Sequence, residues 1–165
     1  MLVLIPRRAK RDLFNLKVLS ERIQRPELHY STRYRCYSSA VKENFCAQSC
    51  TASYWILMTR TALPSSLHKR TAVHEAVVNR CSKSTGVRYD MPFILKAITA
   101  ILTEYVEVGT RLYENSYVRY ESRKELSFSP IIGAFSEEGL SLLALEEHPL
   151  VSCSETGVSV VRRFE

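Results

Sequence analysis

Residues 89–108, "YDMPFILKAITAILTEYVEV", carry the strongest helical pattern in the sequence. Apolar side chains recur there at the three- and four-residue spacing that places them on one face of an α-helix. We expect this face to lie in the core, and it consists of Ile94, Ile98, Ile101 and Tyr105. Polar residues between them, such as Lys96 and Thr99, predict a solvent-facing side. The stretch therefore predicts a core helix with one wet side.

A second helix is predicted just before this one, over residues 68–81, "HKRTAVHEAVVNRC". Val73, Val77 and Cys81 follow helical spacing and are expected to form its buried side. The following "SKSTG" breaks the pattern, and Gly86 suits the turn after a helix because glycine adopts positive φ angles without strain. The sequence thus predicts two consecutive helices.

After Gly109 the apolar period changes from helical to alternating. The segments "TRLYE" and "YVRYESR", separated by "NS", predict a β-hairpin with Tyr117, Arg119 and Glu121 on one face. The next segment, "ELSFSP", predicts a further short strand. This region therefore predicts a small antiparallel sheet that follows the two helices.

The last part of the chain predicts one more helix and a closing hairpin. Ser136 is placed to cap a helix in "SEEGLSLLALEE", and Pro149 would end it. The final apolar segment predicts a hairpin that turns near residues 155–157. The expected fold class is α+β, with two to three helices packed on a small antiparallel sheet and a basic N-terminal extension.

This order of elements resembles the body of the HU/IHF-like DNA-binding fold over residues 68–147. The most similar part is "FILKAITAIL" followed by "VGTRLYENSYVRYESR". The long DNA-binding arms of that family have no counterpart, because residues 122–125 leave too little room for them. The resemblance implies the fold and a tendency to dimerise, and it makes an HU-like nucleic-acid-binding protein one alternative function.

Charge is distributed unevenly along the sequence. Residues 1–90 hold 16 Lys and Arg against 6 Asp and Glu, a net charge of +10, whereas residues 91–165 hold 7 against 11, a net charge of −4. The excess is concentrated in residues 1–37, where "LFNLKVLSERI" predicts a basic amphipathic helix. In "RYRCYSSA", the four residues that begin with Arg35 and end with Ser38 resemble a mitochondrial processing site.

These features predict three segments. Residues 1–37 are expected to be a mitochondrial transit peptide, residues 38–68 a linker or extension, and residues 69–165 the α+β domain. The alternative for the first segment is a retained basic arm that lies on a partner or on nucleic acid. The expected location is mitochondrial, with the cytoplasm as the alternative. Apolar runs such as "SYWILM" are too short for a membrane span, so none is expected.

Cysteine and histidine do not predict a metal site. Cys46 and Cys50 precede His68 and His74, but 17 residues separate Cys50 from His68. A compact zinc finger has about 12 at that place. The five cysteines are odd in number and scattered, which favours reduced thiols in an intracellular compartment, with a Cys46–Cys50 disulfide as the alternative. We expect neither a metal nor a cofactor.

No catalytic constellation is predicted either. Cys81 and His74 lie two turns apart on the predicted helix, which is too far for a nucleophile and its base. The sequence contains no glycine-rich phosphate loop and neither a GxSxG nor an HExxH motif. A protein without enzymatic activity is therefore expected, and a small enzyme with an unrecognised site is kept as an alternative.

Basic and aromatic residues are interleaved in "HYSTRYRCY" and "RLYENSYVRYESRK", as they are on nucleic-acid-binding surfaces. The side chains expected to contact nucleic acid or a partner are Arg33, Arg35, Arg111, Tyr117, Arg119 and Arg123. A sheet face that is only solvated would show the same pattern. The sequence thus predicts a small non-enzymatic accessory or binding subunit of a larger, mitochondrial assembly of proteins or of RNA and protein, with RNA or DNA as a candidate direct contact.

Overall fold

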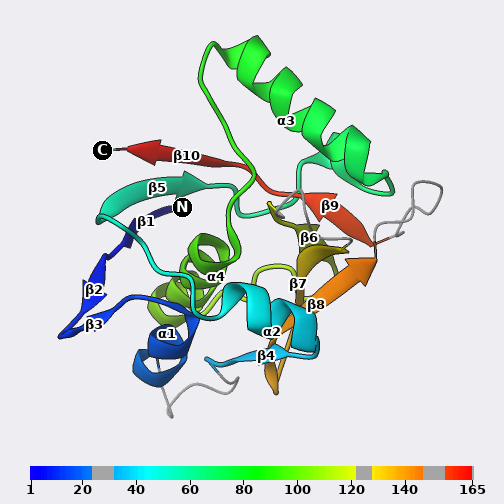
Figure 1. Cartoon of the computed structure of the whole chain (residues 1–165). Coiled ribbons are helices and arrows are strands. Elements are labelled where there is room, and N and C mark those ends of the chain that lie inside the picture. The colour runs from blue at the N-terminus through cyan, green and yellow to red at the C-terminus, as the bar shows by residue number, and fades with distance from the viewer. Residues whose placement is uncertain (24–31, 122–127, 147–154, 165) are drawn as a thin grey trace.

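The computed structural model describes residues 1–23, 32–121, 128–146 and 155–164 (Figure 1). Within these residues the chain forms helices and mixed sheets, which confirms the α+β class. The helices are α1 (Leu16–Arg22), α2 (Ser39–Phe45), α3 (Thr71–Thr85) and α4 (Ile94–Val108), with a short 3-10 helix, η1 (Pro64–Ser66). The strands belong to two sheets and a small hairpin.

The first sheet has three strands in the order β1 (Leu2–Ile5), β5 (Tyr54–Met58) and β10 (Val161–Phe164). Both pairs are antiparallel, so segments from the beginning, the middle and the end of the chain lie side by side. Strand β5 alternates strictly between buried and exposed residues. One face of this sheet therefore belongs to the core and the other faces outward.

The second sheet has five strands in the order β4 (Tyr34–Cys36), β8 (Gly139–Glu146), β7 (Phe128–Ser136), β6 (Tyr117–Arg119) and β9 (Thr156–Val158). The three central strands are antiparallel, and the two outer strands pair in parallel with their neighbours. The remaining strands, β2 (Arg8–Ala9) and β3 (Asp12–Leu13), form a two-stranded hairpin beside α1 (Figure 1).

Helix α4 occupies the centre of the molecule, where it contacts β1, β5 and α1 (Figure 1). Its Tyr105 ring meets the Phe135 ring of β7 edge to face at 4.9 Å between centroids, so the helix also contacts the second sheet. The predicted stripe of Ile94, Ile98 and Ile101 is buried with Tyr105, which confirms it as core. Thr99 was expected to face solvent, but it is also buried, and its hydroxyl donates to the Leu95 carbonyl at 2.6 Å.

Helix α3 lies at the edge of the molecule and buries a narrower face than predicted. His74, Val77 and Val78 are buried, and the two valines pack against the segment around β9, whereas Val73 is exposed. Gly86 ends the helix with φ +66°, as expected for a left-handed cap residue. The helix thus exists as predicted, but its buried side is rotated by about one residue toward His74.

Three predictions on the second half of the chain are wrong. Residues 139–146 form β8 rather than a helix, because this segment pairs with β7 over most of its length. Residues 110–116 form no strand, and β6 pairs with β7 and β9 instead. The predicted turn of the closing hairpin is wrong as well, since Thr156–Val158 form β9, which belongs to another sheet than β10, and the first strand expected of that hairpin lies outside the described residues. In each case, pairing with a distant strand determined the local structure.

Residues 1–23 and residues 38–68 are built into the same core as the rest of the described chain. Val3 and Ile5 of β1 and Leu16 and Leu19 of α1 are buried in the main hydrophobic cluster. Residues 38–68, expected to be a linker, supply α2 and the central strand β5. Cleavage before Ser38 stays a prediction, and it would remove β1 and α1 from this core.

Candidate functional site

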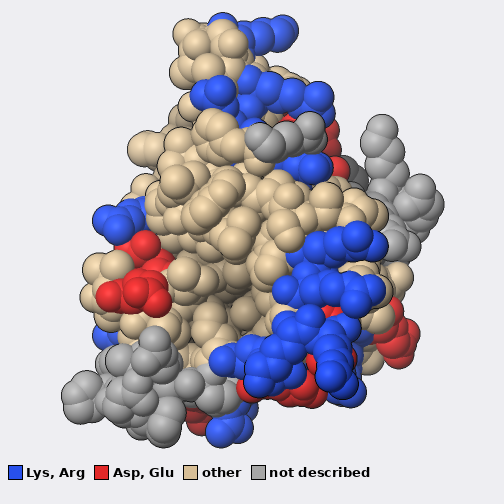
Figure 2. All heavy atoms as spheres, turned by 90° about the vertical axis from the view of Figure 1, so that its left-hand side faces the viewer, with Lys and Arg blue, Asp and Glu red and all other residues tan. Residues whose placement is uncertain are grey.

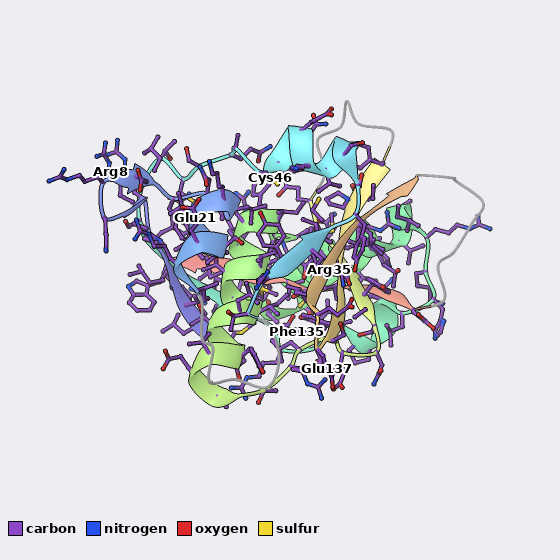
Figure 3. All side chains as sticks on the ribbon, turned by 90° about the horizontal axis from the view of Figure 1, so that it is seen from below. Arg8, Glu21, Arg35, Cys46, Phe135 and Glu137 are labelled. Carbon is purple, nitrogen blue, oxygen red and sulfur yellow. The ribbon has the colours of Figure 1, made fainter. Side chains whose placement is uncertain are left out.

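The residues predicted to contact a partner do not gather on one surface. Arg35 lies on β4 and forms an ion pair with Glu138 in the turn between β7 and β8. Figure 3 labels Arg35 and Glu137, the residue that precedes Glu138 in the chain. In the second sheet, β8 and β7 separate Arg35 from Tyr117 and Arg119 on β6. The six predicted residues therefore do not form a single interface.

The predicted exposed face of β6 is not exposed. Arg119 is only 4% exposed, and Tyr117 is half-buried, on a strand that lies inside the sheet between β7 and β9. Burial lowers the pKa of His74 on α3, and the positive charge of Arg119 lowers it further. The Arg119 guanidinium therefore influences a buried side chain of the fold. Alternation along β6 was predicted to separate core from solvent, but both faces of this strand are covered.

The other predicted contacts lie apart from β6. Arg33 is exposed just before β4. Arg111 is half-buried after α4 and pairs with Glu114 at 2.7 Å. Arg123 lies outside the described residues. Of the predicted set, Arg33 is the side chain that the structure places on the surface most clearly.

Among the described residues, large apolar side chains are exposed next to one another on the outer face of the first sheet. Four large side chains of β1 and β5 are exposed there: Leu2 by 59%, Leu4 by 44%, Trp55 by 48% and Leu57 by 41%. Leu2 pairs with Leu57, Leu4 pairs with Trp55, and Phe164 of β10 pairs with Trp55 on its other side. We call these five residues the apolar face.

Strand alternation explains why this face points outward. In β1 the inner residues are Val3 and Ile5, and in β5 they include Ile56 and Met58, all of which are buried. Every other residue must then point to the opposite side of the sheet. In both strands those residues are also apolar, so the sheet has an apolar core side and an apolar outer side. Scattered exposed leucines need no explanation, but a contiguous apolar sheet face is typical of a binding surface.

Positive charge borders the apolar face. The hairpin of β2 and β3 carries Arg7, Arg8, Lys10 and Arg11, all exposed. Figure 2 shows this side of the molecule, with a broad, hollowed area of uncharged residues and Lys and Arg gathered along one side of it. In Figure 3, Arg8 extends from the hairpin away from the body of the molecule. On β10, the guanidinium of Arg162 stacks over the Phe164 ring at 4.8 Å from its centroid.

The hairpin is held in place by the backbone rather than by its charges. The Arg7 amide donates to the Ser53 hydroxyl at 2.8 Å, and the Phe14 amide donates to the Arg7 carbonyl at 2.9 Å. The Asp12 carboxylate forms an ion pair with the guanidinium of Arg22 on α1 at 3.5 Å, and its negative charge offsets part of the positive charge nearby. The four cations of the hairpin are thus positioned beside the apolar face while their side chains stay in water.

In the described part of the chain, Cys46, Cys50 and His74 make contacts with other residues of the fold. The Cys50 thiol lies 3.5 Å from the Tyr54 hydroxyl, and the Cys46 thiol lies 3.9 Å from the Tyr34 hydroxyl. The His74 Nε2 atom donates to the Ser66 carbonyl at 2.8 Å. Among the described residues, no three His, Cys, Asp or Glu side chains come together as a metal site requires.

No family model, curated protein or solved structure matches this chain. The resemblance of residues 68–147 to the HU/IHF-like fold therefore stays a prediction. Within the described residues, no helix combines the length and the apolar character that crossing a membrane requires.

The apolar face could have been found in the sequence. "LVLI" and "YWILM" are apolar at both odd and even positions, which indicates a strand that is covered on both faces. In the structure one of those faces is covered by α4 and the other is open.

Proposed function

We propose that this protein is a non-enzymatic binding subunit that docks through its apolar face onto another protein in a larger assembly. The observation that carries the proposal is the exposure of four large apolar side chains on one sheet face. Fully burying a Leu or Trp side chain contributes roughly 1.5–3 kcal/mol. Covering four side chains that are about half exposed would therefore favour association by several kcal/mol, and Trp55 would be its central anchor.

The positive charges beside the apolar face indicate the charge of the partner. The chain has a net charge of +6, and four of its cations are exposed in the β2–β3 hairpin at the border of the face. Two copies facing each other would bring these cations together, whereas a partner with an apolar centre and an acidic rim would neutralise them. The proposal is therefore a different, acidic protein rather than a second copy of this chain.

The assembly is proposed to be mitochondrial, and its other components to be proteins or RNA and protein. The support for the location is the pattern from Arg35 to Ser38 together with the basic residues before it. Leu2 and Leu4 lie in the segment that processing would remove. The mature N-terminus, measured by mass spectrometry, therefore tests the location and shows whether β1 belongs to the docking face.

Direct contact with RNA or DNA is the second candidate, and one observation favours it. Arg7, Arg8, Lys10 and Arg11 are exposed in a single hairpin, and cations so placed bind phosphate without sequence preference. Binding of this kind falls log-linearly with salt, whereas an apolar protein interface does not. A titration with mixed RNA and DNA at two salt concentrations separates the two candidates.

The test of the proposed function compares two double variants of the tagged full chain in its own cells. Leu4→Ser with Leu57→Ser disrupts the apolar face, and Val73→Ser with Val108→Ser removes exposed valines from α3 and α4 as the control. We expect a stoichiometric partner to be recovered with the wild-type and control proteins and to be lost with the first variant. The purified pair should then bind with the same dependence.

Two results would contradict the proposal. Partner recovery that is equal for both variants would show that the apolar face is not the docking surface. Sedimentation of the purified protein as a dimer that the Leu4 and Leu57 changes dissociate would identify a second copy as the occupant.

A further inference from the structure

Strand β1 forms one edge of the first sheet. In Figure 1 it lies on the side of β5 that is opposite to β10, and among the described residues no further strand pairs with it. The other edge of this sheet is partly closed, because Val161 of β10 and Asp90 exchange two backbone hydrogen bonds of 2.9 Å. A strand edge with unpaired N–H and C=O groups is a template on which another chain can pair.

The register of β1 determines which of its backbone groups point to the open side. The Met1 nitrogen donates to the Met58 carbonyl at 2.8 Å, and the Met58 amide donates to the Met1 carbonyl at 2.9 Å. In an antiparallel pair, residues bonded in this way alternate with residues whose N–H and C=O groups point away from the neighbouring strand. Counted from Met1, the residues of β1 that point away from β5 are Leu2 and Leu4. Their amides and carbonyls therefore face the open edge.

The side chains and the charges at this edge indicate what would pair with it. Leu2 and Leu4 are also the exposed side chains of β1, so a strand added beside them would place every second side chain on the same outer side and extend the apolar face. Strand β1 ends at Ile5, and the exposed cations of the β2–β3 hairpin follow directly. Carboxylates at the end of the added strand that lies beside Ile5 would be attracted to these cations.

We propose that the open edge of β1 binds an extended, acidic segment of the docking partner as a fourth strand of the first sheet. Backbone hydrogen bonds to Leu2 and Leu4 would hold the segment, and its apolar side chains and carboxylates would select it. The inference rests on the proposed docking function and concerns the full chain. It adds that the partner pairs with the edge of the sheet as well as packing on its apolar face.

A second copy of this chain fits the edge less well than an acidic segment does. Two β1 strands could pair with each other, but each has only four residues. Such a pair would hold the two basic hairpins within roughly 13 Å of each other. This distance is close to the screening length in physiological salt, which is about 8 Å. The hairpins of two copies would therefore repel, whereas carboxylates would neutralise them.

The test measures backbone amide exchange by NMR in the full chain, alone and with a short synthetic peptide in which Thr and Val alternate between two Glu residues at each end. In the free chain, the Leu2 and Leu4 amides should exchange faster than those of Val3 and Ile5, which face β5. The peptide should slow the exchange at Leu2 and Leu4 about tenfold or more. The same peptide with Lys in place of Glu should protect them less, and one with N-methyl groups on its central amides should not protect them.

Two variants at one position separate the backbone donor from the side chain. Leu4→Pro removes the outward N–H, and proline is tolerated at an edge position where this group faces solvent. Leu4→Ala keeps the N–H and shares the loss of the leucine side chain. The acidic peptide should bind Leu4→Pro about tenfold or more weakly than Leu4→Ala. Circular dichroism establishes that both are folded, and the methylated peptide on the wild type decides alone if the proline variant is not.

The inference is overturned if the acidic peptide leaves exchange at Leu2 and Leu4 unchanged, or if the methylated peptide protects them equally. A dimer in which these amides are protected without peptide also overturns it, in favour of a second copy. Loss of the partner through Leu4→Ser with Leu57→Ser, combined with no protection by the peptide, would support the docking face and refute the added strand. Partner recovery that does not depend on these two leucines, combined with protection by the peptide, would contradict the docking face and support the edge.

Discussion

Ile56 and Leu57 are neighbours on β5 whose truncation should have different consequences. Ile56 is completely buried between β1 and β10, and Leu57 is 41% exposed on the apolar face. Changing Ile56 to Ala removes about three methylene equivalents, worth roughly 2.4 kcal/mol of transfer free energy. The cavity left behind raises the expected loss to about 2–5 kcal/mol. For Leu57→Ala the transfer loss scales with its buried fraction to roughly 1.4 kcal/mol, and no closed cavity forms.

Guanidinium chloride denaturation of the full chain measures both losses from the midpoint and the slope. In a chain of this size each kcal/mol shifts the melting temperature by about 2–4 °C, so thermal melting gives an independent estimate. The binding assay should show the reverse order, with Leu57→Ala weakening partner association more than Ile56→Ala. Equal destabilisation by the two variants, with an unchanged slope, would refute the assignment of the two faces of β5.

Three further predictions concern single positions. Burial lowers the pKa of His74 from 6.5, so the imidazole binds a proton more tightly in the unfolded chain than in the folded one. The free energy of unfolding should therefore fall as the pH drops below about 6.5. His74→Gln should reduce this pH dependence, which denaturation at about pH 5 and about pH 7.5 measures. Gly133→Ala should destabilise by more than about 2 kcal/mol, because the added Cβ would clash with the backbone oxygen of Ser116, whereas Gly86→Ala, at φ +66° in open space, should cost about 1–2 kcal/mol by thermal melting. Arg60→Ala should cost about 1–3 kcal/mol because it leaves the buried Glu104 carboxylate without its ion-pair partner at 2.5 Å, and adding Glu104→Gln should recover most of that loss in a double-mutant cycle.

Helix α4 could be predicted because its intrinsic helix preference and its place in the core lead to the same structure. Its residues favour a helix, their apolar spacing is helical, and the same side chains are buried in the structure. Strand β8 is the opposite case. Its Leu, Ala and Glu residues favour a helix when the segment is considered alone, but pairing with β7 over most of its length outweighs that preference. A single sequence contains no information about which distant strand will supply the pairing.

The candidate sites differ in how far the sequence could reveal them. The apolar face is encoded locally, in two strands that are apolar at every position. The cleft of about 520 Å³ that Arg88, Lys96 and Arg163 line is not encoded locally, because a turn, a helix and the last strand meet there. Interleaved Arg and Tyr residues around β6 predicted one exposed face, but Val118 and Arg119 are both buried, so both faces of the strand are covered.

The two interpretations of residues 1–37 predict different kinds of partner for β5. With these residues present, β1 and β10 satisfy both edges of β5, and Leu2 and Leu4 complete the apolar face. Without them, one edge of β5 loses its backbone partners, and Ile56 and Met58 lose Val3 and Ile5 from the core side. An unpaired apolar edge of this kind is a template that tends to pair with another strand. A processed protein would then need a partner that adds a strand beside β5, whereas the full chain needs one that packs on the face of the sheet. The mature N-terminus therefore determines which kind of partner surface the protein requires.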